Sequence, residues 1–165
     1  MNNEQQDLVI DLALKRVSRE TFLELFFSGG DIPENYVRQE LETALGDKDA
    51  DSVECALTFG YLFSLPADCS NVLSRLLGER WHTRHEDIAS ALQILKCPAS
   101  VDSLFEAALA EYSYIGSEYA LGVKCIHALC DIGTDNAREK LRILAQGENP
   151  VLAERAGRLL ATIGS

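Results

Sequence analysis

Hydrophobic residues recur three and four positions apart along almost the whole chain, which is the spacing of the apolar face of an α-helix. No four-residue stretch between turn signals alternates as a half-buried β-strand does. Glycine and proline residues divide this pattern into about ten helical segments. The segments are 4–17, 18–30, 33–46, 51–65, 69–79, 84–96, 99–111, 117–132, 135–146 and 150–163. The sequence therefore predicts an all-α protein.

The segments form pairs, and the pairs repeat. When the second segments of the pairs are superimposed, apolar residues of similar size fall at matching places. The matched residues are Phe59/Phe63, Ala91/Leu95, Cys125/Leu129 and Ala156/Leu160, at spacings of 32, 34 and 31. A repeat of this length made of two helices is typical of an α-solenoid, in which each pair packs only against its neighbours. We predict one domain, an α-solenoid with a helical cap at 1–30 and helix pairs at 31–66, 67–97, 98–133 and 134–165. A plain helical bundle is the alternative.

The same register predicts the core, because apolar residues at matching places face the neighbouring pair. The predicted core residues are Leu57, Phe63, Leu73, Leu77, Ile88, Leu92, Leu95, Leu104, Ala108, Cys125, Leu129, Leu141, Leu144, Ala156 and Leu160. The chain has five cysteines, an odd number, and none stands in a C-x-x-C pair. We therefore expect free thiols that pack as small hydrophobic side chains rather than disulfides or a zinc cluster.

Polar residues also match between the second segments, and together they define a polar ridge. The ridge consists of Thr58, Tyr61, Ser90, Gln93, Lys124, His127, Arg155 and Arg158. Second helices usually line the concave face of a helical solenoid, so the ridge is expected to face a groove. Its C-terminal part is basic and would suit an acidic loop of a partner. Gln93, Lys124, His127, Arg155 and Arg158 are therefore candidate partner contacts.

Charge narrows the choice of partners. The 165 residues carry a net charge of −11, which disfavours binding to phosphate backbones or anionic lipid and favours a basic protein partner. Much of the excess lies in two acidic blocks, residues 31–54 with a local charge of −6 and residues 97–123 with −4. No apolar run is long enough to span a membrane, and the polar start of the chain is unlike a signal peptide. We expect a cytoplasmic monomer.

The second acidic block contains the segment EYSYIGSEY at 111–119, in which tyrosines stand among carboxylates. Tyrosine offers a large contact area at low entropic cost, and neighbouring carboxylates steer a basic partner. The candidate partner contacts here are Asp102, Glu106, Glu111, Tyr112, Tyr114, Glu118 and Tyr119. The alternative is that the tyrosines pack between repeats while the acidic residues form a solvated face.

Candidate chemistry is sparse. The chain has no nucleophile-elbow, phosphate-loop, dinucleotide-binding or zinc-protease motif. His82 and His85 could meet near a helix start with Glu86 or Asp87 to hold a metal ion. The simpler interpretation is packing and helix capping, with both acidic residues opposing the positive end of the helix dipole. We therefore predict no metal, no cofactor and no catalytic residue.

Two stretches of the C-terminal half resemble HEAT-type repeats: HEDIASALQILKCPASVDSLFEAAL at 85–109 and EYALGVKCIHALCDIGTDNAREKLRILA at 118–145. The combination of WHTRHEDI, LQILKCP and VKCIHALCDIGT is similar to small HEAT-like bacterial proteins that are encoded beside polymorphic toxins. These toxins include those of contact-dependent growth inhibition systems, and the small proteins act as immunity proteins. The resemblance covers roughly residues 80–163, while residues 1–80 match only as generic helix pairs.

The resemblance implies that the chain binds a cognate toxin domain in the cytoplasm and blocks its active site or its access to substrate, without cofactor or reaction. Many such toxins attack nucleic acid and carry a basic groove, which an acidic inhibitor would complement. Two other classes stay open. One is a general HEAT-like adaptor in a larger assembly. The other is an enzyme similar to a HEAT-like bilin lyase, for which Cys130, His127 and Glu118 are the candidate residues.

Overall fold

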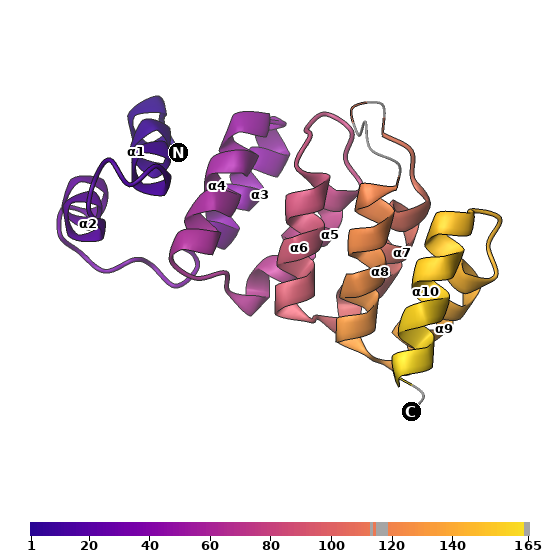
Figure 1. Ribbon diagram of the computed structural model, residues 1–165. Helices are drawn as coiled ribbons and strands as arrows, with labels where there is room; N and C mark the ends of the chain where they lie inside the picture. Colours follow the sequence, from indigo (N-terminus) through magenta and orange to yellow (C-terminus); the bar gives the residue numbers. More distant parts are fainter. Residues whose placement is uncertain (113, 115–118, 164–165) are drawn as a thin grey trace. The chain divides into compact units, whose positions relative to one another are not determined.

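The computed structural model describes residues 1–112, 114 and 119–163, and over this range it is entirely helical (Figure 1), which confirms the predicted all-α class. The α-helices are α1 (Asn3–Ala13), α2 (Arg19–Phe27), α3 (Tyr36–Asp47), α4 (Ala50–Leu62), α5 (Ser70–Leu77), α6 (His85–Leu95), α7 (Val101–Leu109), α8 (Ala120–Ile132), α9 (Asp135–Ala145) and α10 (Pro150–Ile163). Two short 3-10 helices, η1 (Ala67–Cys69) and η2 (Pro98–Ser100), precede α5 and α7. The chain divides into two compact units, 1–72 and 73–165, and the division falls inside α5.

Several helices begin at a side chain that satisfies the otherwise unpaired N–H groups of the first turn. Asn2 caps α1 in a reciprocal capping box with Gln5. Ser18, the predicted N-cap, accepts the N–H of the third residue after it and starts α2. Asp49 and Thr134 cap α4 and α9 in the same way. These caps fix the helix starts independently of packing.

Other helix ends differ from the predicted ones. The first helix ends at Ala13 rather than near residue 17, because Lys15 adopts a left-handed conformation with φ of 58°. Pro33 does not lie in the first turn of a helix: α3 begins at Tyr36, whose N–H donates to the Pro33 carbonyl at 3.0 Å in the preceding turn. The segments predicted at 99–111 and 117–132 are shorter, since α7 ends at 109 and α8 begins at 120.

The unit of residues 1–72 is built around aromatic side chains. Helix α4 packs against α1 and α3, and α1 also contacts α2. Phe22 and Phe59 are almost fully buried, with ring centroids 6.0 Å apart, and Phe26 stacks on Phe22 at 4.8 Å. Aromatic pairs of this geometry add to the stabilisation from area burial alone. The ring cluster therefore holds α2 and α4 together.

In the unit of residues 73–165, α8 is central and contacts α6, α7, α9 and α10. Helices α6, α8 and α10 lie side by side, and α7 and α9 form a second layer (Figure 1). A Cβ added at Gly122 on α8 would lie 2.7 Å from a methyl carbon of Leu152 and 2.9 Å from the Ala108 carbonyl oxygen. A larger residue at Gly122 would therefore push α8 away from its neighbours.

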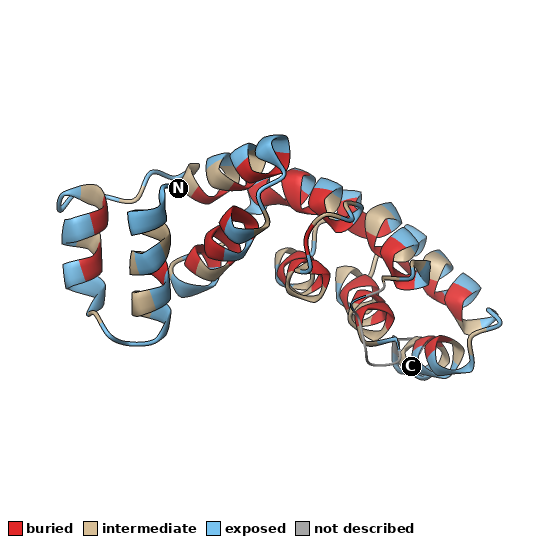
Figure 2. Cartoon of the chain, turned by 90° about the horizontal axis from the view of Figure 1, so that it is seen from above, coloured by how far each residue is buried: buried red, intermediate tan, exposed pale blue. Residues whose placement is uncertain are grey.

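Most of the predicted core is buried, and the buried residues form stripes along the helices (Figure 2). Three predictions were wrong: Phe63, Leu95 and Leu160 are only half-buried. Each lies at or near the C-terminal end of its helix, where the neighbouring helix gives less cover. The buried residues missed by the repeat register include Phe22 and Leu41, in the part of the chain where the repeat was weakest.

Candidate partner-binding surfaces

Two buried histidines, His82 and His85, lie just before and at the start of α6. Their rings stack with centroids 4.3 Å apart. Nε2 of His82 is 2.9 Å from the Leu76 carbonyl oxygen, and Nδ1 accepts the backbone N–H of Arg84 at 3.1 Å. Because a carbonyl only accepts and an N–H only donates, His82 is the neutral tautomer that carries its proton on Nε2.

His85 has the same arrangement. Its Nε2 lies 2.6 Å from the Glu79 carbonyl oxygen, and its Nδ1 accepts the Tyr114 hydroxyl. Burial lowers the pKa of His82 and lowers that of His85 to about 4, so both rings are neutral at pH 7. All four ring nitrogens thus have partners within the protein.

These contacts bear on the two interpretations of the histidines. A metal ion at this place would have to displace hydrogen bonds from the ring nitrogens. Glu86, the third suggested ligand, is instead 3.4 Å from the Lys124 ammonium on α8. Within the described ranges, no three His, Cys, Asp or Glu side chains are grouped to hold a metal ion. Glu86 and Asp87 occupy the first turn of α6, where they oppose the positive end of the helix dipole. The expectation that His82 or Thr83 caps this helix was wrong, because the N-cap residue is Arg84, whose side chain makes no capping hydrogen bond.

The tyrosines of the segment 111–119 differ in their surroundings. Tyr112 is half-buried, donates its hydroxyl to the Leu77 carbonyl at 3.0 Å and packs its ring 4.0 Å from that of His85. Tyr114 is 39% exposed although its hydroxyl binds His85, and burial raises its pKa to about 12. Tyr119, 46% exposed, precedes α8 in a left-handed conformation. The contacts of Tyr112 are those of the packing alternative, whereas Tyr114 and Tyr119 present surface to solvent.

The acidic candidates of the second block are also dispersed. The Asp102 carboxylate is 3.0 Å from the Lys140 ammonium of α9. Glu106 and Glu111 are exposed, and the Glu111 carbonyl accepts a hydrogen bond from Arg80 at 3.0 Å. Glu118 lies outside the described residues. Asp102 thus has a cation partner within the unit, while Glu106 and Glu111 present carboxylates to solvent.

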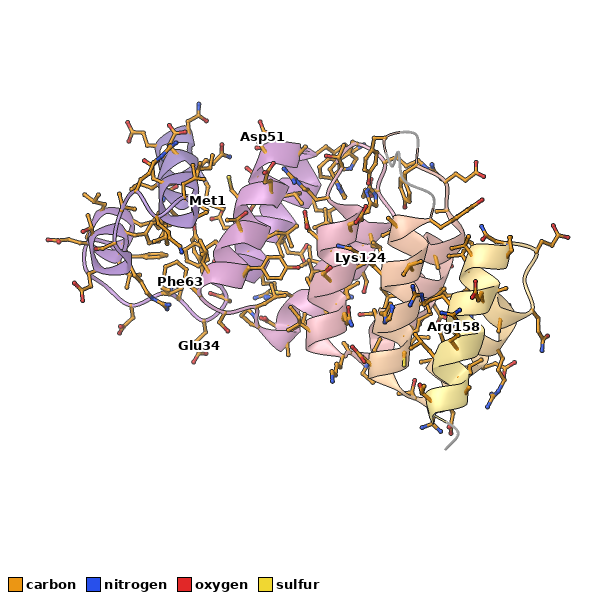
Figure 3. The ribbon with its side chains drawn as sticks, in the orientation of Figure 1. Met1, Glu34, Asp51, Phe63, Lys124 and Arg158 are labelled. Atoms are coloured by element: carbon orange, nitrogen blue, oxygen red, sulfur yellow. The ribbon has the colours of Figure 1, made fainter. Side chains whose placement is uncertain are left out.

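The structure brings part of the polar ridge together. Gln93 on α6 donates to the Asp131 carboxylate on α8 at 2.6 Å, and the Lys124 ammonium is 3.4 Å from the Ser90 hydroxyl. Lys124 and Arg158 project from the same side of the unit of residues 73–165 (Figure 3). Arg158 pairs with Glu154 of its own helix at 2.5 Å. His127 is half-buried and Arg155 is exposed. Two separate polar contacts therefore join the α6 part of the ridge to α8, and Arg155 and Arg158 lie on α10.

The cysteines are free, and burial raises the pKa of the thiols of Cys55, Cys69, Cys125 and Cys130. Cys125 is buried on α8, and burial raises its pKa to about 12. Burial and the neighbouring Asp131 also raise the pKa of Cys130 above its ordinary value. A raised pKa reduces the thiolate fraction, which is the nucleophilic form. Of the three candidate residues of the lyase alternative, Cys130 has a raised thiol pKa and His127 is half-buried, while Glu118 lies outside the described residues.

Negative charge is divided unequally between the two units. Residues 1–72 contain 14 Asp and Glu against 5 Lys and Arg, a net charge of −9, whereas residues 73–165 contain 12 against 10, a net charge of −2. The first acidic block, 31–54, lies wholly in the first unit. The unit of residues 1–72 is therefore the more strongly acidic surface.

That unit also has a groove that the sequence analysis missed. The α1–α4 groove has a volume of about 350 Å³ and is lined by Gln6, Asp7, Val9, Ile10, Ala13, Leu14, Asp51, Glu54, Cys55 and Thr58. The available signal was the spacing of Asp7, Ile10 and Leu14, which places them along one side of a helix. The helix-pair repeat does not extend to residues 1–30, so the repeat register did not indicate a groove there.

Comparisons with protein-family models, with curated proteins and with solved structures find no match to this chain. Among the helices of the described residues, none is both long and apolar enough to cross a membrane.

Proposed function

We propose that this protein is a non-catalytic inhibitor that binds and neutralises the basic domain of a cognate bacterial toxin in the cytoplasm. The observation that carries this proposal is the concentration of negative charge in residues 1–72, a net of −9. A surface of one sign accelerates the association of an oppositely charged partner and disfavours partners of the same sign. A toxin domain with a basic substrate groove is such a partner.

The proposal also includes the fold of the immunity proteins that the chain resembles, a solenoid of HEAT-like helix pairs. The layered arrangement of α6, α8 and α10 over α7 and α9 supports it for residues 73–165. Helical repeat proteins are well suited to protein binding because each added pair extends a continuous surface without changing the core.

The non-catalytic character of the proposal is supported by how the reactive side chains are used. The ring nitrogens of His82 and His85 bind partners within the protein. Burial raises the pKa of the thiols of Cys55, Cys69, Cys125 and Cys130. Buried thiols with a raised pKa are poor nucleophiles, as expected of cysteines that serve only in packing.

The experiment that tests the proposal is co-expression of the tagged chain with the product of the gene beside its own. We expect the two proteins to co-purify at low salt, the complex to weaken as salt is raised, and the chain to protect cells against that product. Capture without protection would favour the adaptor interpretation. Absence of both capture and protection, with the chain folded, would contradict the proposed function.

A further inference from the structure

The α1–α4 groove has a buried apolar floor and open apolar walls. Val9 and Cys55 form the floor and are 0% and 5% exposed. Ile10 and Leu14 line one wall and remain 46% and 55% exposed, although large aliphatic side chains gain free energy when they leave water. Both are therefore positioned to bury apolar surface against another molecule.

Polar contacts join the two helices that form the groove. The Gln6 side-chain amide on α1 donates to the Ser52 hydroxyl on α4 at 3.0 Å, and that hydroxyl donates to the Asp49 carboxylate at 2.7 Å. Asp49 in turn accepts the N–H groups of the first turn of α4. A groove that is formed before binding does not lose the free energy of ordering it, so more of the contact energy appears as affinity.

The rim of the groove is acidic. Asp7 on α1 and Asp51 and Glu54 on α4 are exposed carboxylates in its lining, and the lining contains no Lys, Arg or His. Asp51 lies in the first turn of α4 (Figure 3). Arg16, which follows α1, is engaged with Asp11 at 3.1 Å. Burial is the largest cause of the raised pKa of Cys55, about 11; the carboxylates of Glu54, Asp51 and Asp49 raise it further, and the N-terminal ammonium lowers it.

We propose that the α1–α4 groove is the docking site of a basic amphipathic helix of the partner protein, an inference that rests on the proposed function. The partner helix places apolar residues at i, i+4 and i+7 over Ile10 and Leu14. Lysines or arginines beside this stripe pair with Asp7 and Asp51. A helix suits the site because a third helix packs naturally into the groove between two others. An acidic or uncharged apolar segment would offer no cation to Asp7 and Asp51.

The test uses a synthetic peptide of about 18 residues, long enough to form a helix that spans α1. Leucines stand at i, i+4, i+7 and i+11 and lysines beside them. One control peptide has the same composition with the leucines spread around the helix, and another has glutamates in place of the lysines. Binding to the full chain is measured by fluorescence anisotropy at low and high salt. The first peptide should bind at least ~10-fold more tightly than either control.

Matched variants locate the binding. Ile10→Ser with Leu14→Ser removes the apolar wall formed by α1 and should weaken peptide binding at least ~10-fold, whereas Leu25→Ser, 61% exposed on α2, should leave binding unchanged. Thr58→Arg fills the groove without removing an apolar contact and should have the same effect as the double variant. Circular dichroism establishes that each variant is folded.

A second pair of variants tests the rim. Asp7→Asn with Asp51→Asn should weaken binding ~5-fold or more at low salt and less at high salt, because salt screens exposed charges. The control, Glu24→Gln with Glu34→Gln, removes two exposed carboxylates outside the groove lining. Equal losses for the two pairs would mean that the peptide responds to net charge rather than to the groove, and would overturn the inference.

Three further outcomes overturn it: no binding of the first peptide, equal binding of the peptide with spread leucines, or no effect of either groove variant. If the groove variants lose the peptide but still capture the neighbouring gene product, the docking site is wrong and the proposed function stands. If the peptide binds as expected but no neighbouring gene product is captured, the proposed function fails and the groove remains a site for basic helices.

Discussion

Truncation of Leu129 to alanine tests the packing of α8. The Leu129 side chain is 0% exposed, on the helix that contacts α6, α7, α9 and α10. Removing about three buried carbons costs roughly 2.4 kcal/mol of transfer free energy at about 0.8 kcal/mol each. The cavity that remains adds to this cost, because neighbours on every side restrict collapse. We expect the free energy of unfolding to fall by about 3–5 kcal/mol.

The assay is urea unfolding followed by tryptophan fluorescence. Trp81 is the only tryptophan of the chain and lies within residues 73–165, so its emission reports the unit that contains Leu129. With a slope of about 1–3 kcal/mol per molar urea, the midpoint should move down by about 1–5 M. The matched control is Leu109→Ala, the same change at a side chain that is 57% exposed at the end of α7. It should cost less than ~0.5 kcal/mol.

The assignment of α8 as the central helix would be refuted by a cost below about 1 kcal/mol for Leu129→Ala with an unchanged slope. It would be refuted equally by similar costs at Leu129 and Leu109. A change of slope would instead report a change in the surface exposed on unfolding, and the two midpoints would then not be comparable.

Three other perturbations have definite expected outcomes. Gly122→Ala should destabilise the protein by about 1–3 kcal/mol in thermal or urea unfolding, because the Cβ of the new alanine would clash with the Ala108 carbonyl oxygen. The control is Gly157→Ala on α10, where an added Cβ has no neighbouring atom within 4 Å, and it should be neutral or stabilising. Lowering the pH from about 6.5 to 4 should destabilise residues 73–165. The pKa values of His82 and His85 are lower in the folded state, so the unfolded state binds more protons in this pH range. For one histidine the free energy of unfolding should change by up to about 1.4 kcal/mol per pH unit, which is measured from melting curves at several pH values. A chelator should leave the melting temperature unchanged, because hydrogen bonds occupy the histidine nitrogens; a fall that zinc reverses would contradict this.

The helices were predictable from sequence because their apolar periodicity is strong, while several of their ends were not. The rules for helix ends rely on glycine to supply positive φ. In this chain Ser28, Lys48 and Lys96 end their helices in the left-handed conformation instead. A lysine in the sequence does not indicate a positive φ, because residues other than glycine rarely adopt that conformation. Predicted boundaries therefore moved by a few residues, although each predicted segment corresponds to an α-helix within the described residues.

The candidate surfaces were less predictable, because they depend on contacts between residues distant in the chain. Tyr114 and His85 are 29 residues apart, and no periodicity relates them. The α1–α4 groove likewise joins residues 6–14 to residues 51–58. The sequence indicated the residue types and the charge of these regions. It did not indicate that the Tyr112 hydroxyl would donate a hydrogen bond to the Leu77 carbonyl within the same unit.

The unequal charge of the two units has an energetic consequence. A unit of net −9 repels itself, and this repulsion destabilises the compact state. The cluster of Phe22, Phe26 and Phe59 opposes it with a large buried aromatic area, whereas residues 73–165, with a net charge of only −2, are packed mainly through small and aliphatic side chains. Carboxylates that served stability alone would be balanced by nearby cations, as Asp102 is by Lys140. In the complex that we propose, a basic partner at the α1–α4 groove would relieve this repulsion and bury Ile10 and Leu14.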